Sequence, residues 1–314
     1  MDQQLLSSRA VQGMYYSRLE LNPGIAWVNG VSNYFPSDQA SEMYTFLGQS
    51  PMMREFLGGL QAKGLRSDYL EIINKHYEGS LQIETKDLRR DKTGQILARV
   101  NEFADKTLAH WASLLSTLIL NGETGLCYDG QYFFDTDHSE GDSGTQSNDI
   151  SVDISALPAK VHGSTTAPSK EEMQQAIMSG IKQIMSFKDD QGEPMNETAM
   201  NFAVLVPSSL YLTALAAVDK ANNMALETDE NPARFTIDVQ MNPRLDSWTT
   251  KFAIFRTDSA TKALIRQEET EPNLETLWVG SEYETLNKKV LATVDSWRNA
   301  GYGFWQRACL VTLT

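Results

Sequence analysis

Cysteine is scarce in this sequence, and long apolar runs are missing. The 314 residues include two cysteines, Cys127 and Cys309, which lie far apart and form no CxxC pair. This pattern excludes a disulfide framework and a zinc ribbon, and it is typical of free thiols in a reducing cytosol. No stretch approaches the about 18 uninterrupted apolar residues of a membrane-spanning helix, and the first residues lack the pattern of a secretory signal. We therefore expect a protein made in the cytosol.

Basic charge is also in deficit. Lys and Arg number 27 against 41 Asp and Glu, which gives a net charge of -14. Tight binding to nucleic acid phosphates requires a basic surface, so we expect a surface that tolerates DNA without gripping it. The densest basic cluster comprises Lys86, Arg89, Arg90 and Lys92, and acidic residues interleave with it. This mixture indicates a solvated helix start with local ion pairs, or a contact with an acidic neighbour.

Familiar catalytic motifs are absent. The sequence contains no GxSxG, GxxxxGK[ST], HExxH or Rossmann GxGxxG pattern. Asp135, Asp137 and His138 in FFDTDHSE come closest to a metal site, because two carboxylates and an imidazole at this spacing can chelate a divalent ion. The structural alternative, which we favour, is a polar turn held by side-chain-to-backbone hydrogen bonds. Cys127 lies in no activated-thiol motif. We therefore predict no catalytic residue, no cofactor and no metal site.

One long amphipathic helix is the clearest element. Apolar residues recur at steps of three and four between residues 95 and 121, which is the pattern of one helix face. The members of this face are Ile96, Val100, Phe103, Thr107, Trp111, Leu115 and Leu118. Gly122 follows as a C-terminal stop. We expect this helix to act as a spine packed on the C-terminal strands.

The second half of the chain mixes helices with strands. Residues 135–168 are rich in Asp, Ser, Gly and Thr and indicate a long surface excursion. Ser169 and Glu172 then form the capping-box pattern of a helix. NFAVLVP, from residue 201, indicates a strand, and a helix follows it. The last hundred residues alternate as strands, and the GxG of AGYGFW enters a strand, so the predicted class is α+β.

The N-terminal part shows a weaker pattern. Residues 1–24 are polar and indicate an arm with little core of its own. Leu81 and Ile83 alternate with polar residues, the period of a half-buried strand, and Gly79 marks a bulge or bend. Three glycines lie upstream of this run. Together these features predict a projecting β-hairpin with a flexible tip.

Three stretches resemble one known family. They are INKHYEGSLQIETKDLRRDKTG (residues 73–94), LILNGETGLCYDGQYFFDTDH (residues 118–138) and VDSWRNAGYGFWQRA (residues 294–308). Their order and spacing resemble the major head subunit (major capsid protein) of Mu-like tailed bacteriophages, a family with the Hong Kong 97 capsid fold. The resemblance spans nearly the whole chain.

The resemblance implies an architecture for every part of the chain. The implied parts are an N-terminal arm (1–35), a first peripheral part (36–56), an extended loop (57–85), the spine helix of the peripheral domain (86–123), an axial domain (124–265) and peripheral C-terminal strands (266–314). The extended loop would reach over a neighbouring subunit, and the axial domain would meet its copies around a local symmetry axis.

The resemblance also implies a non-enzymatic, structural function. The subunit would self-assemble as hexamers and pentamers into an icosahedral head in the host cytoplasm and would become part of the virion. Expected partners are a separate scaffolding protein, a portal and a decoration protein, with double-stranded DNA enclosed and no membrane. Two alternatives stay open: an encapsulin-like nanocompartment shell, and a metal-dependent hydrolase that uses the DTDH loop.

Overall fold

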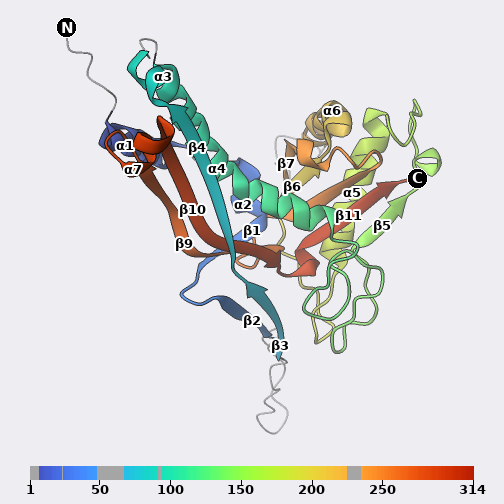
Figure 1. Cartoon of the computed structure of the whole chain (residues 1–314). Helices are drawn as coiled ribbons and strands as arrows, with labels where there is room; N and C mark the ends of the chain where they lie inside the picture. Colours follow the sequence, from blue (N-terminus) through green and yellow to red (C-terminus); the bar gives the residue numbers. More distant parts are fainter. Residues whose placement is uncertain (1–6, 23, 48–66, 91–93, 225–234) are drawn as a thin grey trace.

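Two larger β-sheets and one long helix organise the molecule. The computed structural model describes residues 7–22, 24–47, 67–90, 94–224 and 235–314. Its strands form a four-stranded sheet, a five-stranded sheet and a two-stranded hairpin. Figure 1 shows α4 running along the four-stranded sheet toward the five-stranded one, with the hairpin projecting from the region between them.

The elements follow one another in a mixed order. The helices are α1 (Ser8–Leu21), α2 (Ala26–Val31), α3 (Thr85–Arg90), α4 (Gln95–Leu120), α5 (Lys170–Ser186), α6 (Ser208–Met224) and α7 (Glu282–Asn287), with the short 3-10 helices η1 (Ile154–Ala156), η2 (Pro243–Leu245) and η3 (Trp305–Arg307). The strands are β1 (Ser32–Pro36), β2 (Ser41–Leu47), β3 (Ser67–Ile73), β4 (Lys75–Glu84), β5 (Asp149–Val152), β6 (Asn201–Val206), β7 (Thr236–Met241), β8 (Lys251–Arg256), β9 (Leu264–Leu277), β10 (Lys289–Tyr302) and β11 (Ala308–Leu313). Within the described ranges, no helix combines the length and the apolar character needed to cross a bilayer.

The four-stranded sheet has the order β1-β9-β10-β4. Strand β10 pairs antiparallel with both β4 and β9, and β1 runs parallel to β9. Every second residue of β10 from Val290 to Arg298 is buried, because strand side chains alternate between the two faces. The buried face packs under α1 and α4 in one apolar cluster: Val11, Tyr15, Leu88, Ile96, Val100, Ala104, Leu274, Trp278, Val290, Ala292 and Val294. The predicted packing of the spine helix on C-terminal strands is confirmed.

The five-stranded sheet has the order β5-β11-β8-β6-β7. Its central strands β6, β8 and β11 are buried almost throughout, as expected for a sheet covered on its faces. Helix α5 packs so closely on it that a Cβ on Gly180 would lie 2.5 Å from Ile254 Cδ1. The predicted capping box of Ser169 and Glu172 is present at the start of α5.

The predicted bounds of helix α4 are confirmed to within a residue, although Gly122 does not have the predicted role of a helix-ending glycine. Residues Gln95–Leu120 are helical, and Val100 and Leu115 on the predicted face are fully or almost fully buried. Gly122 does not adopt the left-handed backbone of a helix-ending glycine. A Cβ there would instead lie 2.3 Å from Phe134 Cδ2, so Gly122 makes room for a buried ring.

The prediction of an N-terminal arm with little core of its own does not hold for the described residues. Val11 and Tyr15, one turn apart on α1, are completely buried against α4. Arg18 adds an ion pair with Asp105 of α4 at 2.8 Å. Only a few apolar residues of α1 face the core, and polar residues surround them in the sequence. The polar composition of the segment therefore gave no sign of this buried face.

The extended loop predicted at 57–85 does not extend to residue 85. Residues 75–84 form β4, which pairs along its whole length with β10. The projecting hairpin consists of β2 and β3, and most of its predicted tip lies outside the described residues. The bulge predicted at Gly79 is also wrong, because the β4–β10 register is regular there. Gly79 is needed instead because a Cβ would come within 3.1 Å of the Phe103 ring.

The last residues connect the two sheets. Strand β11 pairs with β5 and β8, so residues 308–313 lie in the five-stranded sheet and apart from β9 and β10. The AGYGFW segment ends strand β10, whereas the sequence pattern predicted that it enters a strand. A Cβ on Gly303 would lie 2.7 Å from the Lys262 carbonyl oxygen, so close backbone packing requires this glycine.

Candidate functional site

Asp135, Asp137 and His138, which come closest to a metal-site pattern, lie in a hydrogen-bonded turn. His138 Nδ1 lies 2.6 Å from Asp129 Oδ2, and both side chains are buried. The Asp135 carboxylate accepts a hydrogen bond from the backbone N–H of Tyr132 at 3.2 Å. No group of three or more metal-ligating side chains occurs in the part of the chain that the structure describes. The hydrogen bonds of the turn are those expected from a structural role.

A buried polar network surrounds Trp305 of η3. The His138 imidazole stacks on the Trp305 ring with 4.0 Å between centroids. The Glu140 carboxylate accepts hydrogen bonds from Trp305 Nε1 at 3.1 Å and from Gln306 Nε2 at 2.8 Å, and a further one from the Tyr128 hydroxyl. Burial raises the pKa of Glu140. The network attaches the loop after α4 to the C-terminal segment.

Sequence reasoning missed Asp129 and Glu140. Asp129 lies in the YDG segment, where the residues indicated only a turn. Glu140 lies after the DTDH turn, in a polar segment predicted to form a surface loop. The partners of Glu140, Trp305 and Gln306, come about one half of the chain later. Asp129 pairs with His138, whose place in the DTDH turn gave no sign of burial.

The thiol of Cys127 is buried in an environment that keeps it unreactive. Burial raises its pKa well above the usual value, with the Asp129 charge acting in the same direction. Nucleophilic and metal-binding chemistry requires the thiolate, so this environment disfavours both.

The basic cluster lies on α3, where Lys86 pairs with Glu84 at 2.5 Å, as expected for a solvated helix start. Lys92 lies outside the described residues.

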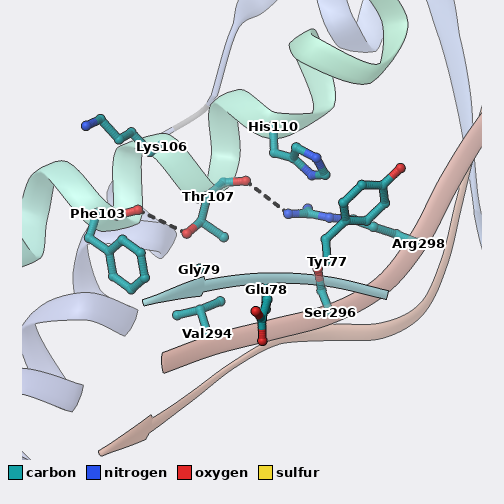
Figure 2. Close-up of a pocket in the computed structure, with 10 residues that line it drawn as sticks. All are labelled: Tyr77, Glu78, Gly79, Phe103, Lys106, Thr107, His110, Val294, Ser296 and Arg298. Atoms are coloured by element: carbon teal, nitrogen blue, oxygen red, sulfur yellow. Dashed lines mark hydrogen bonds between the residues drawn. The ribbon is translucent and has the colours of Figure 1, made fainter. Parts of the chain in front are cut away.

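A cleft opens between helix α4 and strands β4 and β10, and we call it the α4 cleft. It encloses about 210 Å³ and is lined by Tyr77, Glu78, Gly79, Phe103, Lys106, Thr107, His110, Val294, Ser296 and Arg298. Figure 2 shows Phe103 and Val294 at one end, and His110, Tyr77 and Arg298 together at the other. The α4 cleft therefore has an apolar end and a polar end.

The β2–β3 hairpin has one packed face and one bare face. Ile72 points into the molecule, where a Cβ on Gly301 would lie 2.4 Å from its Cδ1. On the opposite face, Met43, Tyr69 and Ile73 are 62%, 65% and 58% exposed. Three large apolar side chains on one face of a two-stranded hairpin form an exposed patch of the kind that marks an interaction surface.

Strand β10 also carries a large exposed side chain near the hairpin. Asn299 Nδ2 donates a hydrogen bond to the Ile73 carbonyl oxygen at 2.7 Å, which places β10 beside the base of the hairpin. Trp297, on the same side of β10 as Asn299, is 40% exposed and stacks on His76 with 4.8 Å between centroids. Sequence patterning alone did not reveal these exposed side chains.

Comparison with solved structures defines the class of fold. The chain is similar to the procapsid of bacteriophage JBD30, with a TM-score of 0.53 and 21% identity, covering 96% of this chain and 72% of that chain. It is also similar to the virus-like particle from Pyrococcus furiosus, with a TM-score of 0.56 and 11% identity, covering 96% and 98% of the two chains. The capsid of cyanophage P-SCSP1u gives a TM-score of 0.56 at 11% identity, covering 93% and 88%. The molecule has the Hong Kong 97-type α+β capsid fold, as the resemblance predicted.

Sequence comparison then identifies the family. The family model described as Mu-like prophage major head subunit gpT matches residues 10–157 and 236–313, which is more than half of the chain. The chain belongs to this family. The unmatched residues between these two segments include α5, β6 and α6.

Two named phage and prophage proteins are similar to this chain in sequence. The chain is 30% identical over 122 residues to the Mu-like prophage FluMu major head subunit of Haemophilus influenzae, covering 39% of this chain and 40% of the relative. It is 29% identical over 110 residues to the major capsid protein of Escherichia phage Mu, covering 35% and 36%. The chain thus spans about two fifths of the length of the relatives that it matches.

Proposed function

We propose that this chain is the structural subunit of a tailed-bacteriophage head, and that many copies assemble into a closed icosahedral shell around double-stranded DNA. The observation that carries the proposal is the bare face of the β2–β3 hairpin in a chain of the Mu-like head subunit family. Isolated hairpins are marginally stable in water, so a hairpin that projects with three exposed apolar side chains gains most from burial by another copy. Obligate assemblies bury about 2,000–5,000 Å² per interface.

The two larger sheets support a division of the subunit into a peripheral and an axial domain. In this proposal the four-stranded sheet with α4 forms the peripheral domain, and the five-stranded sheet with α5 and α6 forms the axial domain around the local symmetry axis. The hairpin reaches over a neighbouring copy. The axial part would then include β11, in addition to most of residues 124–265.

The partners follow from the same proposal. The subunit would form hexamers and pentamers in the host cytoplasm, with a separate scaffolding protein, a portal and a decoration protein, and would have no enzymatic activity. The net charge of -14 suits a shell that encloses DNA without sequence-specific binding, because like charges repel. An encapsulin-like compartment would use the same fold, but the family match favours a phage head.

Electron microscopy of the purified chain tests the proposal directly, and closed shells are the expected result. In the double variant Tyr69→Ser and Ile73→Ser, we expect a folded subunit by circular dichroism but a large loss of particles, because the contact surface has lost its apolar groups. Leu286→Ser is the matched control, since Leu286 is 74% exposed and belongs to α7, which lies at the opposite end of the four-stranded sheet from the hairpin (Figure 1). Normal shells from the double variant would exclude the hairpin as the main contact, and a wild-type chain that never oligomerises would contradict the proposal itself.

A further inference from the structure

The β2–β3 hairpin joins the rest of the chain at two points that are bonded to each other. The chain enters the hairpin through residues 37–40 and leaves it through Asn74, the single residue that separates β3 from β4. The backbone N–H of Asn74 donates a hydrogen bond to the Ala40 carbonyl oxygen at 2.8 Å. Its side-chain Nδ2 donates to the Gln39 carbonyl oxygen, also at 2.8 Å. The entry and the exit of the hairpin are therefore tied together.

Two side-chain amides of the four-stranded sheet hold the exit. Gln267 of β9 is completely buried, and its Nε2 donates to the Ile72 carbonyl oxygen at 3.2 Å and to Asn74 Oδ1 at 2.8 Å. Asn299 lies directly opposite Gln267 on β10. Its Nδ2 donates to the next carbonyl oxygen of β3, that of Ile73, at 2.7 Å. We call Asn74, Gln267 and Asn299 the amide lock.

The amide lock leaves the hairpin little freedom to swing. A hinge consists of a few residues, often at the end of an element, whose backbone angles can change. Asn74 occupies such a position, but it is only 6% exposed, and its N–H and its side chain are both hydrogen-bonded. A large rotation there would take both acceptors away from the buried amide of Gln267, and buried polar groups are costly to leave unpaired. The bare face of the hairpin is therefore held at one angle to the four-stranded sheet.

We propose that the amide lock is a positioning device, which orients the bare face of the hairpin for docking on another copy before the two copies meet. This inference rests on the proposed function and adds how the contact surface is presented. Association costs less when the contact surface is already ordered, because no segment has to lose conformational freedom on binding. Met43, Tyr69 and Ile73 make the contact, whereas the amide lock acts through its hold on the hairpin.

The angle of the hairpin is measured by electron paramagnetic resonance on the full-length chain, at a concentration too low for assembly. One spin label is attached to the hairpin at Met43→Cys and one to α4 at Lys106→Cys, because these side chains are 62% and 73% exposed. Both native cysteines are buried. We expect one narrow distribution of distances between the labels. Gln267→Met keeps the length of the side chain and removes its hydrogen-bond donors, so the distribution should become about twofold wider as the hinge is released.

Val290→Ala is the matched control, because Val290 is completely buried in the same sheet, toward the other end of β10 from Asn299. It should lower the urea midpoint but should not widen the distribution. Asn299→Ala removes one hydrogen bond at a partly exposed position and should widen the distribution to a smaller extent, so it supplies the test if Gln267→Met does not fold. A broad distribution in the chain with an intact amide lock overturns the proposal, and so does an equal width in all variants.

Shell formation gives the second readout, by light scattering and electron microscopy of the unlabelled chains at equal concentrations of folded protein. We expect Gln267→Met to lower the yield of shells about tenfold relative to Val290→Ala, because each contact now has to order the hairpin. Equal yields would overturn the docking role of the amide lock. The distance distributions do not require shells. A wild-type chain that never assembles would therefore contradict the proposed function, while the distributions would still decide whether the amide lock holds the hairpin.

Discussion

The guanidinium of Arg298 lies over the ring of Trp111, 5.0 Å from the ring centroid, and joins strand β10 to helix α4. Arg266 on β9 approaches the same ring at 5.6 Å. Trp111 is only 8% exposed. One aromatic side chain on the helix is thus approached by two cations on the sheet, and cation–π contacts of this kind are stronger when they are desolvated.

Replacement of Trp111 by Ala should therefore leave mostly insoluble protein. Truncating a buried Trp costs about 3–5 kcal/mol, a large part of the about 5–15 kcal/mol that stabilises a domain. Lys106→Ala is the control on the same helix, because the Lys106 side chain is 73% exposed and its surface ion pair contributes about 1 kcal/mol at most. Soluble yield and urea unfolding of the two variants check the contrast. Equal yields would mean that the helix is not packed as described.

Replacing His138 should lower the stability of the fold strongly, whereas replacing its neighbour Asp137 should not. The His138 side chain is fully buried, pairs with buried Asp129 and stacks on Trp305. His138→Ala should cost about 3–5 kcal/mol, because it removes one partner of a buried pair. Asp137 is exposed, and Asp137→Ala should stay within about 0.5 kcal/mol. Chemical unfolding measures both values. A stoichiometric metal that disappears with His138→Ala would instead support the metal-site interpretation of this turn.

The carboxylate of Glu172 should stabilise the fold in a pH-dependent way. Burial by itself would raise its pKa, but hydrogen bonds from the backbone N–H groups of Ser169 and Gly163 and from His162 more than compensate, so its pKa lies below 4.5. A lowered pKa contributes stability above the unfolded value, and this contribution is lost as pH falls through the folded value. Glu172→Gln should cost about 1–3 kcal/mol at pH 7. The difference from the wild-type chain should shrink below about pH 4, and a difference that stays constant from pH 7 to pH 3 would contradict this.

Local patterns carried most of the correct secondary-structure predictions. The helix of residues 95–120, the capping box at Ser169 and the strand from Asn201 all rest on interactions within a few residues, which periodicity reports. The errors lie where a partner far along the chain decides. Gly79 resembled a bulge because nothing nearby reveals the ring of Phe103, and α1 resembled a coreless arm because its two buried residues need α4 to cover them.

The family, the α+β class and the long spine helix could be predicted from the residues alone, because these features depend on motif order and on short-range periodicity. The fold was needed to show which strands share a sheet, that β4 and β11 belong to different sheets, and that His138 pairs with Asp129. The fold also revealed the bare face of the hairpin. The physical reason is that exposure and hydrogen-bond satisfaction depend on every atom packed around a group. Those atoms come from segments that the linear sequence keeps apart.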